Sequence, residues 1–178
     1  MEAGGHRGAF EASKAEARMV GLFSLLPAVA DAVRIPVVAT GGIADGRGVA
    51  AALILGASAV QIGTALLRCP EAKIAPAWAD AIGRAAPEAT VLTRAFSGRA
   101  GRSLATAYAQ TAAEPAVPRP APYPVQRGLT AAMREAAQKE NDIDRMQAWA
   151  GQSAGLARAE PAGDVVRRIW AEAQALLG

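Results

Sequence analysis

The chain has 178 residues, of which 52% are hydrophobic, 20% are charged and only 4% are aromatic, so the length and composition fit one ordinary domain with a small-aliphatic core. The net charge of +3 comes without any block of lysine or arginine, which argues against nucleic-acid binding, and no stretch is long and apolar enough for a membrane helix. Cys69 is the only cysteine and His6 the only histidine, which excludes an intramolecular disulfide and a multi-histidine metal centre and favours a cytoplasmic setting.

The N-terminal third begins as a loop and continues as a helix. Residues 2–16 are rich in glycine and charge, which is typical of a loop. Apolar residues between Leu22 and Val33 then recur at helical spacing, which predicts a helix with Ser24 as its N-cap and Pro27 in its first turn.

Two short apolar runs, 35–40 and 59–62, end in glycine and are predicted to be buried parallel strands. Predicted helices at 48–55, closed by Gly56, and at 74–86 alternate with them. This order predicts an α/β fold with a parallel sheet. Because two parallel strands cannot bury both of their faces in one compact domain, the sequence predicts part of a larger sheet.

The pattern changes after residue 88, which predicts a division into residues 1–88 and an extension over residues 89–178. The expected elements of the extension are a strand over Thr90–Thr93, a flexible polar loop over 97–102, a proline-rich linker at 113–124 and helices near 128–139, 142–150 and 162–177.

The ends of the two predicted strands share one design. Gly41 and Gly42 follow the first strand, and Gly63 and Thr64 follow the second. Glycine allows close approach to the backbone, and the N-terminus of a following helix offers free N–H groups, so together they can hold a phosphate. The alternative is that both are ordinary strand-to-helix turns, but two consecutive strands of this design favour phosphate.

His6 is a candidate for proton transfer. It lies among glycines in the segment Gly4-Gly5-His6-Arg7-Gly8, and an imidazole can take or give a proton near neutral pH. No second residue of a catalytic pair is visible in the sequence, so a structural or merely exposed histidine remains an alternative.

Three segments together resemble the nitronate monooxygenases, formerly called 2-nitropropane dioxygenases. The segment 3–8, AGGHRG, resembles the histidine loop of that family. Segments 36–48 and 56–64 resemble its last two barrel strands with their phosphate loops, and the tail around 123–126 and 149–152 is similar to its C-terminal extension. The resemblance covers nearly the whole chain.

The resemblance implies an α/β chain that is part of a TIM-type (β/α)8 barrel, namely its last two strands and their helices, with a helical C-terminal extension. It implies non-covalent FMN, a small-molecule nitronate such as propionate 3-nitronate, and O₂ as partners, with a carbonyl compound and nitrite as products. His6 would be the active-site base, and no metal is implied. The implied FMN-binding residues are Gly4, Gly41, Gly42, Gln61, Gly63 and Thr64.

The chain departs from the family in one respect, because family members carry about six barrel strands before the histidine loop. We therefore hypothesise a fragment, which would act with a missing N-terminal half or as a homo-oligomer, or would be a non-catalytic remnant. Another alternative is a related flavin-dependent enoyl-thioester reductase, although Arg7 and the tail favour the nitronate enzymes. A barrel of the IMP dehydrogenase kind would need a nucleophilic cysteine where His6 lies. Cys69 instead follows the second phosphate loop and is expected to be a packing residue.

Overall fold

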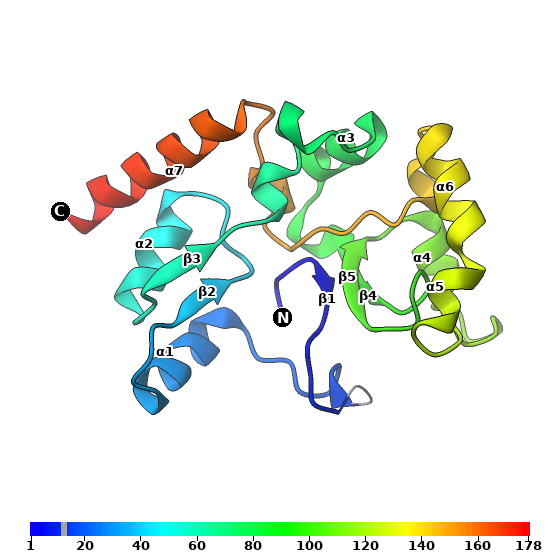
Figure 1. Cartoon of the computed structure of the whole chain (residues 1–178), viewed down its shortest axis with the longest axis horizontal. Coiled ribbons are helices and arrows are strands. Elements are labelled where there is room, and N and C mark those ends of the chain that lie inside the picture. The colour runs from blue at the N-terminus through cyan, green and yellow to red at the C-terminus, as the bar shows by residue number, and fades with distance from the viewer. Residues whose placement is uncertain (12–13) are drawn as a thin grey trace.

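The structure, a computed structural model, describes residues 1–11 and 14–178 and is an α/β fold. Its elements gather in two groups on either side of the N-terminal segment (Figure 1). The first group contains the strands β2 (Val38–Thr40) and β3 (Ala59–Gln61) with the helices α1 (Leu22–Ala32), α2 (Gly46–Ile54) and α7 (Ala162–Leu177). The second contains β1 (Gly5–His6), β4 (Thr90–Thr93) and β5 (Gly101–Leu104) with α3 (Pro76–Arg84), α4 (Ala107–Thr111), α5 (Val125–Leu129) and α6 (Ala131–Lys139).

The parallel pair β2–β3 is covered on one face only. Ala39 in the middle of β2 is 2% exposed, whereas its neighbour Val38 is 54% exposed. Successive side chains of a strand point to opposite faces, so the helices cover the Ala39 face and leave the other face open. The expectation of strands buried on both sides is therefore wrong for this chain, while the expectation that two strands leave a face uncovered agrees with it. Both strands are also shorter than predicted, and Ile35 lies exposed before β2.

The core of the first group lies between β2–β3 and the helices α2 and α7. Val165, Ile169 and Ala173 form the buried stripe of α7, as its helical spacing predicts, whereas Val166 and Trp170 remain about half exposed. Cys69 is 3% exposed in the same core, so its expected role in packing is confirmed.

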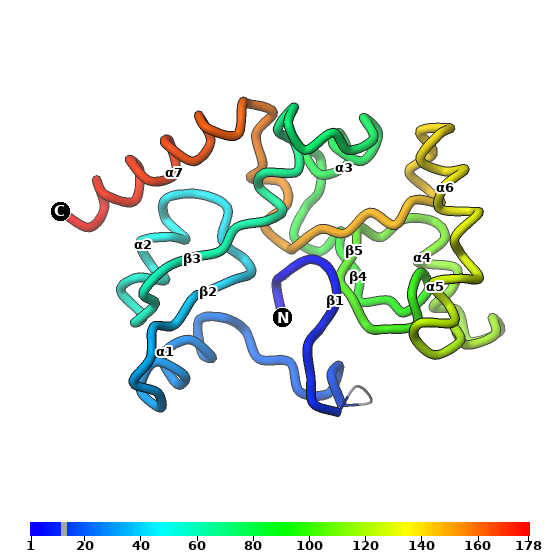
Figure 2. The backbone as a smooth tube through the Cα atoms, viewed as in Figure 1, coloured from blue at the N-terminus to red at the C-terminus, as the bar shows by residue number. Residues whose placement is uncertain are grey.

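The second group is built on an antiparallel sheet of order β1–β5–β4. The segment after α6 leaves this group, crosses the middle of the molecule and continues into α7 (Figure 2). On its way it forms a bridge between Trp149 and Ser103 of β5. The alanines of this crossing segment, Ala148 and Ala150, are fully buried, so the segment joins the two groups through close backbone packing.

Four local predictions were wrong because distant residues decide the local structure. α1 begins at Leu22 rather than after Ser24, since the Glu2 carboxylate accepts the Leu22 N–H (3.0 Å), and Pro27 consequently lies inside the helix. The expected N-terminal loop contains β1, which pairs with β5.

The other two corrections concern the extension. The segment 97–102 is not a flexible loop, because Ser97 and Ala100 are buried and its last two residues belong to β5. The segment 142–150 holds only the 3-10 turn Ile143–Arg145 and is otherwise extended, because its backbone pairs with β5. Residues 113–124 contain no helix or strand, as the prolines predict. Within residues 1–11 and 14–178, no helix is long and apolar enough to cross a bilayer.

The crossing of α2 and α7 requires glycine at position 46. A Cβ at Gly46 would lie 2.3 Å from the Glu172 Cβ and 2.6 Å from the Ala173 N. We therefore expect Gly46→Ala to lower the free energy of unfolding by about 1–3 kcal/mol, because the backbones would have to separate. Urea denaturation measures this change. Gly128→Ala in α5 is the matched control, since its Cβ would meet nothing within 4 Å, and equal stability of the two variants would contradict the prediction.

Candidate functional site

A cavity of about 220 Å³ lies where the carboxyl ends of β2 and β3 meet the N-terminal segment. It is lined by the loops that follow the two strands, by the residues before β1 and by two residues of the crossing segment. All six residues predicted to bind a cofactor line this one cavity: Gly4, Gly41, Gly42, Gln61, Gly63 and Thr64. The structure therefore brings the predicted binding residues together in space. His6, the predicted catalytic residue, does not line this cavity.

The backbone after β2 requires glycine. Gly41 and Gly42 have φ angles of 101° and 73°, a region that side chains with a Cβ rarely adopt. A Cβ at Gly41 would also lie 2.9 Å from the backbone N of Ala3. Among the described residues none accepts a hydrogen bond from the N–H of Gly42 or Gly63, so both amides are available to a ligand in the cavity.

The helix N-termini expected at the strand ends do not provide free N–H groups. At the start of α2, the Gly48 N–H donates to Asp45 Oδ1 (3.1 Å) and the Gly46 N–H donates to Glu172 Oε2 (3.1 Å). The hydrogen bond from Gly46 also lowers the pKa of Glu172. After β3 only a 3-10 turn, Thr64–Leu66, follows. The cavity therefore offers loop amides and a hydroxyl, and the prediction that helix N-termini provide the N–H groups was wrong.

The crossing segment contributes two lining residues that sequence reasoning missed, Gly151 and Ser153. The Gly151 N–H donates to Thr64 Oγ1 (3.0 Å), so the hydroxyl proton of Thr64 is left for another acceptor. The Gln152 N–H donates to the Glu2 carbonyl (2.9 Å) beside the same cavity. The tail motif at 149–152 was noticed in the sequence, but nothing local indicates contact with a residue 87 positions earlier.

The cavity lined by Gly4, Gly41, Gly42 and Gly63 is called the glycine cavity below. His6 is held on β1 outside this cavity. Its Nε2 lies 2.7 Å from Ser97 Oγ, and its ring makes edge contacts with Trp149 (5.3 Å between centroids) and Tyr123 (6.0 Å). Gly5 and His6 pair with Arg102 and Gly101 of β5. The histidine is therefore positioned by a strand, a hydroxyl and two aromatic rings, and it does not lie on a flexible loop.

The surroundings of His6 favour the neutral imidazole. Partial burial lowers the pKa of His6, and the charges of Arg99 and Arg127 lower it further. A neutral imidazole can accept a proton or a hydrogen bond at neutral pH, which is the form that a general base needs.

Comparison with known proteins shows one consistent likeness. Residues 1–172 match the family model described as Nitronate monooxygenase. A nitronate monooxygenase of Paraburkholderia phytofirmans is 41% identical over 172 residues, which are 97% of this chain and 47% of that protein. A probable nitronate monooxygenase of Staphylococcus aureus strain Newman is 41% identical over 94% of this chain and 47% of its own length. The chain thus spans about half the length of the curated relatives that it matches.

Two solved structures are also similar to this chain. A nitroalkane oxidase from Streptomyces ansochromogenes superposes with a TM-score of 0.90 at 41% identity, over 100% of this chain and 52% of that one. FabK from Thermotoga maritima superposes with a TM-score of 0.80 at 35% identity, over 99% of this chain and 53% of that one.

The Thr64–Gly151 hydrogen bond gives a testable prediction. Thr64→Val removes the acceptor of the Gly151 N–H, and we expect a loss of about 1–3 kcal/mol in the free energy of unfolding because Gly151 is buried. Chemical denaturation and hydrogen exchange of the Gly151 amide measure the loss. Thr64→Ser keeps the oxygen and serves as the control. Unchanged protection of the Gly151 amide in Thr64→Val would show that the bond has no such role.

The pKa of His6 gives a second prediction. Because the folded chain holds this pKa below its ordinary value of 6.5, the unfolded chain takes up the proton first as the pH falls. The contribution of His6 to stability is thus intact above pH 6.5 and is lost between that value and the lowered folded pKa. We expect Arg99→Ala to raise the folded pKa, which a proton NMR titration of this only histidine measures. A pKa that stays unchanged in Arg99→Ala would contradict the assigned cause.

Proposed function

The chain belongs to the nitronate monooxygenase family, and from this premise we propose that it is part of an FMN-dependent enzyme that oxidises alkyl nitronates with O₂. The products would be a carbonyl compound and nitrite, and propionate 3-nitronate is a representative substrate. The observation that supports this proposal most directly is the meeting of Gly4, the Gly41–Gly42 loop, Gln61 and the Gly63–Thr64 loop in one cavity.

The donors around this cavity fit the phosphate of FMN. Its lining contains backbone amides and the hydroxyls of Thr64 and Ser153, and none of its lining residues is acidic. Converging loop amides bind anions without a basic side chain, because each N–H points a partial positive charge at the ligand. A bound flavin supplies the electron-accepting chemistry, and the residues of this chain hold and orient it.

We propose that residues 1–88 are part of a TIM-type barrel and that residues 89–178 are its mostly helical extension. The uncovered face of β2–β3 carries Val38, Thr40, Ala59 and Gln61, whose positions pair in register as Val38↔Ala59 and Thr40↔Gln61. An inward-facing row of this kind is what a closed barrel would bury, with further strands on both free edges of the pair. The extension stays in contact with the first part through β1–β5 and α2–α7.

His6 would act on the substrate as a hydrogen-bonding and proton-accepting group. The bond between its Nε2 and Ser97 Oγ fixes the orientation of the ring, and the edge contact with Trp149 limits its rotation. Its lowered pKa keeps the ring neutral and able to accept a hydrogen bond or a proton at neutral pH.

A second candidate function is that of a flavin-dependent enoyl-thioester reductase, which the Gly4-Gly5-His6 loop also suits. The two candidates differ in the electron donor. Adding NADH and propionate 3-nitronate separately to the flavin-loaded full-length form distinguishes them, because only the true donor would bleach the flavin under nitrogen.

Gly63 offers a direct test of the FMN site. A Cβ at Gly63 would meet no protein atom within 4 Å, so Gly63→Val leaves the fold intact while its side chain enters the space that the phosphate needs. We expect at least about tenfold weaker FMN binding, measured as quenching of flavin fluorescence. Gly8→Val is the matched control, because Gly8 is equally free of contacts and does not line the cavity. Equal FMN affinity of the two variants, or no FMN binding by the unaltered chain, would contradict the proposed site.

A further inference from the structure

A second cavity, of about 530 Å³, shares no lining residue with the glycine cavity. We propose that it binds a small organic carboxylate with a flat apolar body. The guanidinium groups of Arg7 and Arg99 would hold the carboxylate, and the side chains of Phe10, Pro122 and Tyr123 would cover the body. This proposal goes beyond the proposed function, because the cavity has no lining residue in common with the one assigned to the flavin phosphate.

The cavity is lined by two arginines, Arg7 and Arg99, that pair with no carboxylate among the described residues. Arg7 Nη1 donates to the Met1 carbonyl (3.1 Å), and Arg99 donates to the Arg7 carbonyl from Nε (3.1 Å) and Nη2 (2.9 Å). Within the described part of the chain, neither guanidinium has a carboxylate partner. Arg94 at the same cavity differs, since its Nε lies 3.2 Å from Glu16 Oε1.

The carbonyl contacts leave both guanidinium groups with further N–H donors. An arginine carries several donors in a planar fork, of which Arg7 uses one nitrogen and Arg99 two in these bonds. The fork matches the two oxygens of a carboxylate, and such charge-assisted bonds are about twice as strong as neutral ones. A carboxylate in this cavity would therefore gain charge-assisted hydrogen bonds from both arginines.

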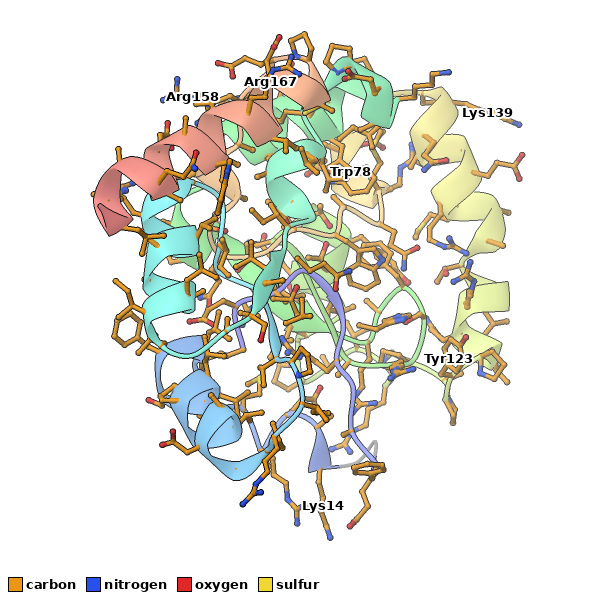
Figure 3. All side chains as sticks on the ribbon, turned by 60° about the vertical axis from the view of Figure 1, so that its left-hand side comes forward. Lys14, Trp78, Tyr123, Lys139, Arg158 and Arg167 are labelled. Carbon is orange, nitrogen blue, oxygen red and sulfur yellow. The ribbon has the colours of Figure 1, made fainter. Side chains whose placement is uncertain are left out.

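Apolar side chains line the same cavity. Phe10 is fully exposed and Tyr123 is 50% exposed, and both line the cavity together with Pro120 and Pro122. In Figure 3, Tyr123 lies at the lower right, on the side away from α7. Cavities of roughly 300–1,000 Å³ with apolar walls and a few polar groups are typical of small-molecule sites. The combination selects for a ligand that has an acidic end and a flat hydrophobic end.

Two contacts connect this cavity to His6. Ser97 Oγ accepts a hydrogen bond from the backbone N–H of Arg99 (3.3 Å) and lies 2.7 Å from His6 Nε2, while the ring of Tyr123 makes an edge contact with His6. Arg99 and Arg127 are the charges that act on the imidazole. A carboxylate bound by Arg99 would offset one of these two charges. The NMR signals of His6, the only histidine in the sequence, would therefore report whether the cavity is occupied.

The test is a titration of the full chain with benzoate, followed by the proton NMR signals of the His6 imidazole. We expect a saturable shift of these signals and a higher pKa of His6 in the bound state. Arg7→Ala and Arg99→Ala should each weaken benzoate binding at least about tenfold, because each removes one charged partner. Arg158→Ala is the matched control, since Arg158 lies at the opposite periphery of the molecule in Figure 3 and should leave binding unchanged.

Two further ligands separate charge from shape. Benzyl alcohol keeps the ring and lacks the charge, and inorganic phosphate keeps a charge and lacks the ring, so both should bind at least about tenfold more weakly than benzoate. Arg99→Lys accompanies Arg99→Ala as a folded variant that keeps the charge and loses the planar fork, and it should also bind benzoate less tightly.

The proposal fails if benzoate gives no saturable shift in the unaltered chain, or if the shift is equally strong in both arginine variants. It also fails if phosphate or benzyl alcohol produces the same arginine-dependent shift as benzoate. These outcomes are independent of FMN binding, so Gly63→Val should leave benzoate binding unchanged. A chain that binds benzoate and not FMN would therefore contradict only the proposed function.

Discussion

The arrangement of this chain depends on one constraint, which is that a pair of parallel strands needs cover on both faces and here has it on one. α1, α2 and α7 bury the Ala39 face of β2–β3, while Val38 on the other face is more than half exposed. The glycine cavity opens at the carboxyl ends of the same pair. Because ligand sites of parallel sheets lie at those ends, the two-stranded sheet already positions the loops that would hold a phosphate.

Sequence patterns predicted those features that are encoded locally. The apolar runs located β2 and β3, the helical stripe located α7, and the glycines after each strand led to residues that line one cavity. The patterns failed where a distant residue decides. Glu2 sets the start of α1, and β5 takes both β1 and the segment before Gly151 as neighbours. No window of the sequence contains both partners of such a contact, so its chemistry cannot be read from spacing.

The grouping of charged side chains in the fold could not be predicted from the sequence either. The arginines are scattered along the sequence and form no basic block, yet Arg7, Arg94 and Arg99 line one cavity in the folded chain. In the sequence, His6 lies between Gly4, which lines the glycine cavity, and Arg7, which lines the second cavity. The imidazole is held by Ser97 and contacts Tyr123 of the second cavity.

The hydrogen bond from Gly46 to Glu172 has a consequence for biosynthesis. The first turn of α2 is completed by a carboxylate that lies 126 residues further along the chain. On the ribosome, α2 emerges before α7, and the 126 residues from Gly46 to Glu172 must be translated before this contact can form. During that interval the apolar surface of α2 is available to chaperones and to neighbouring nascent chains, which makes the order of translation part of how this molecule reaches its final shape.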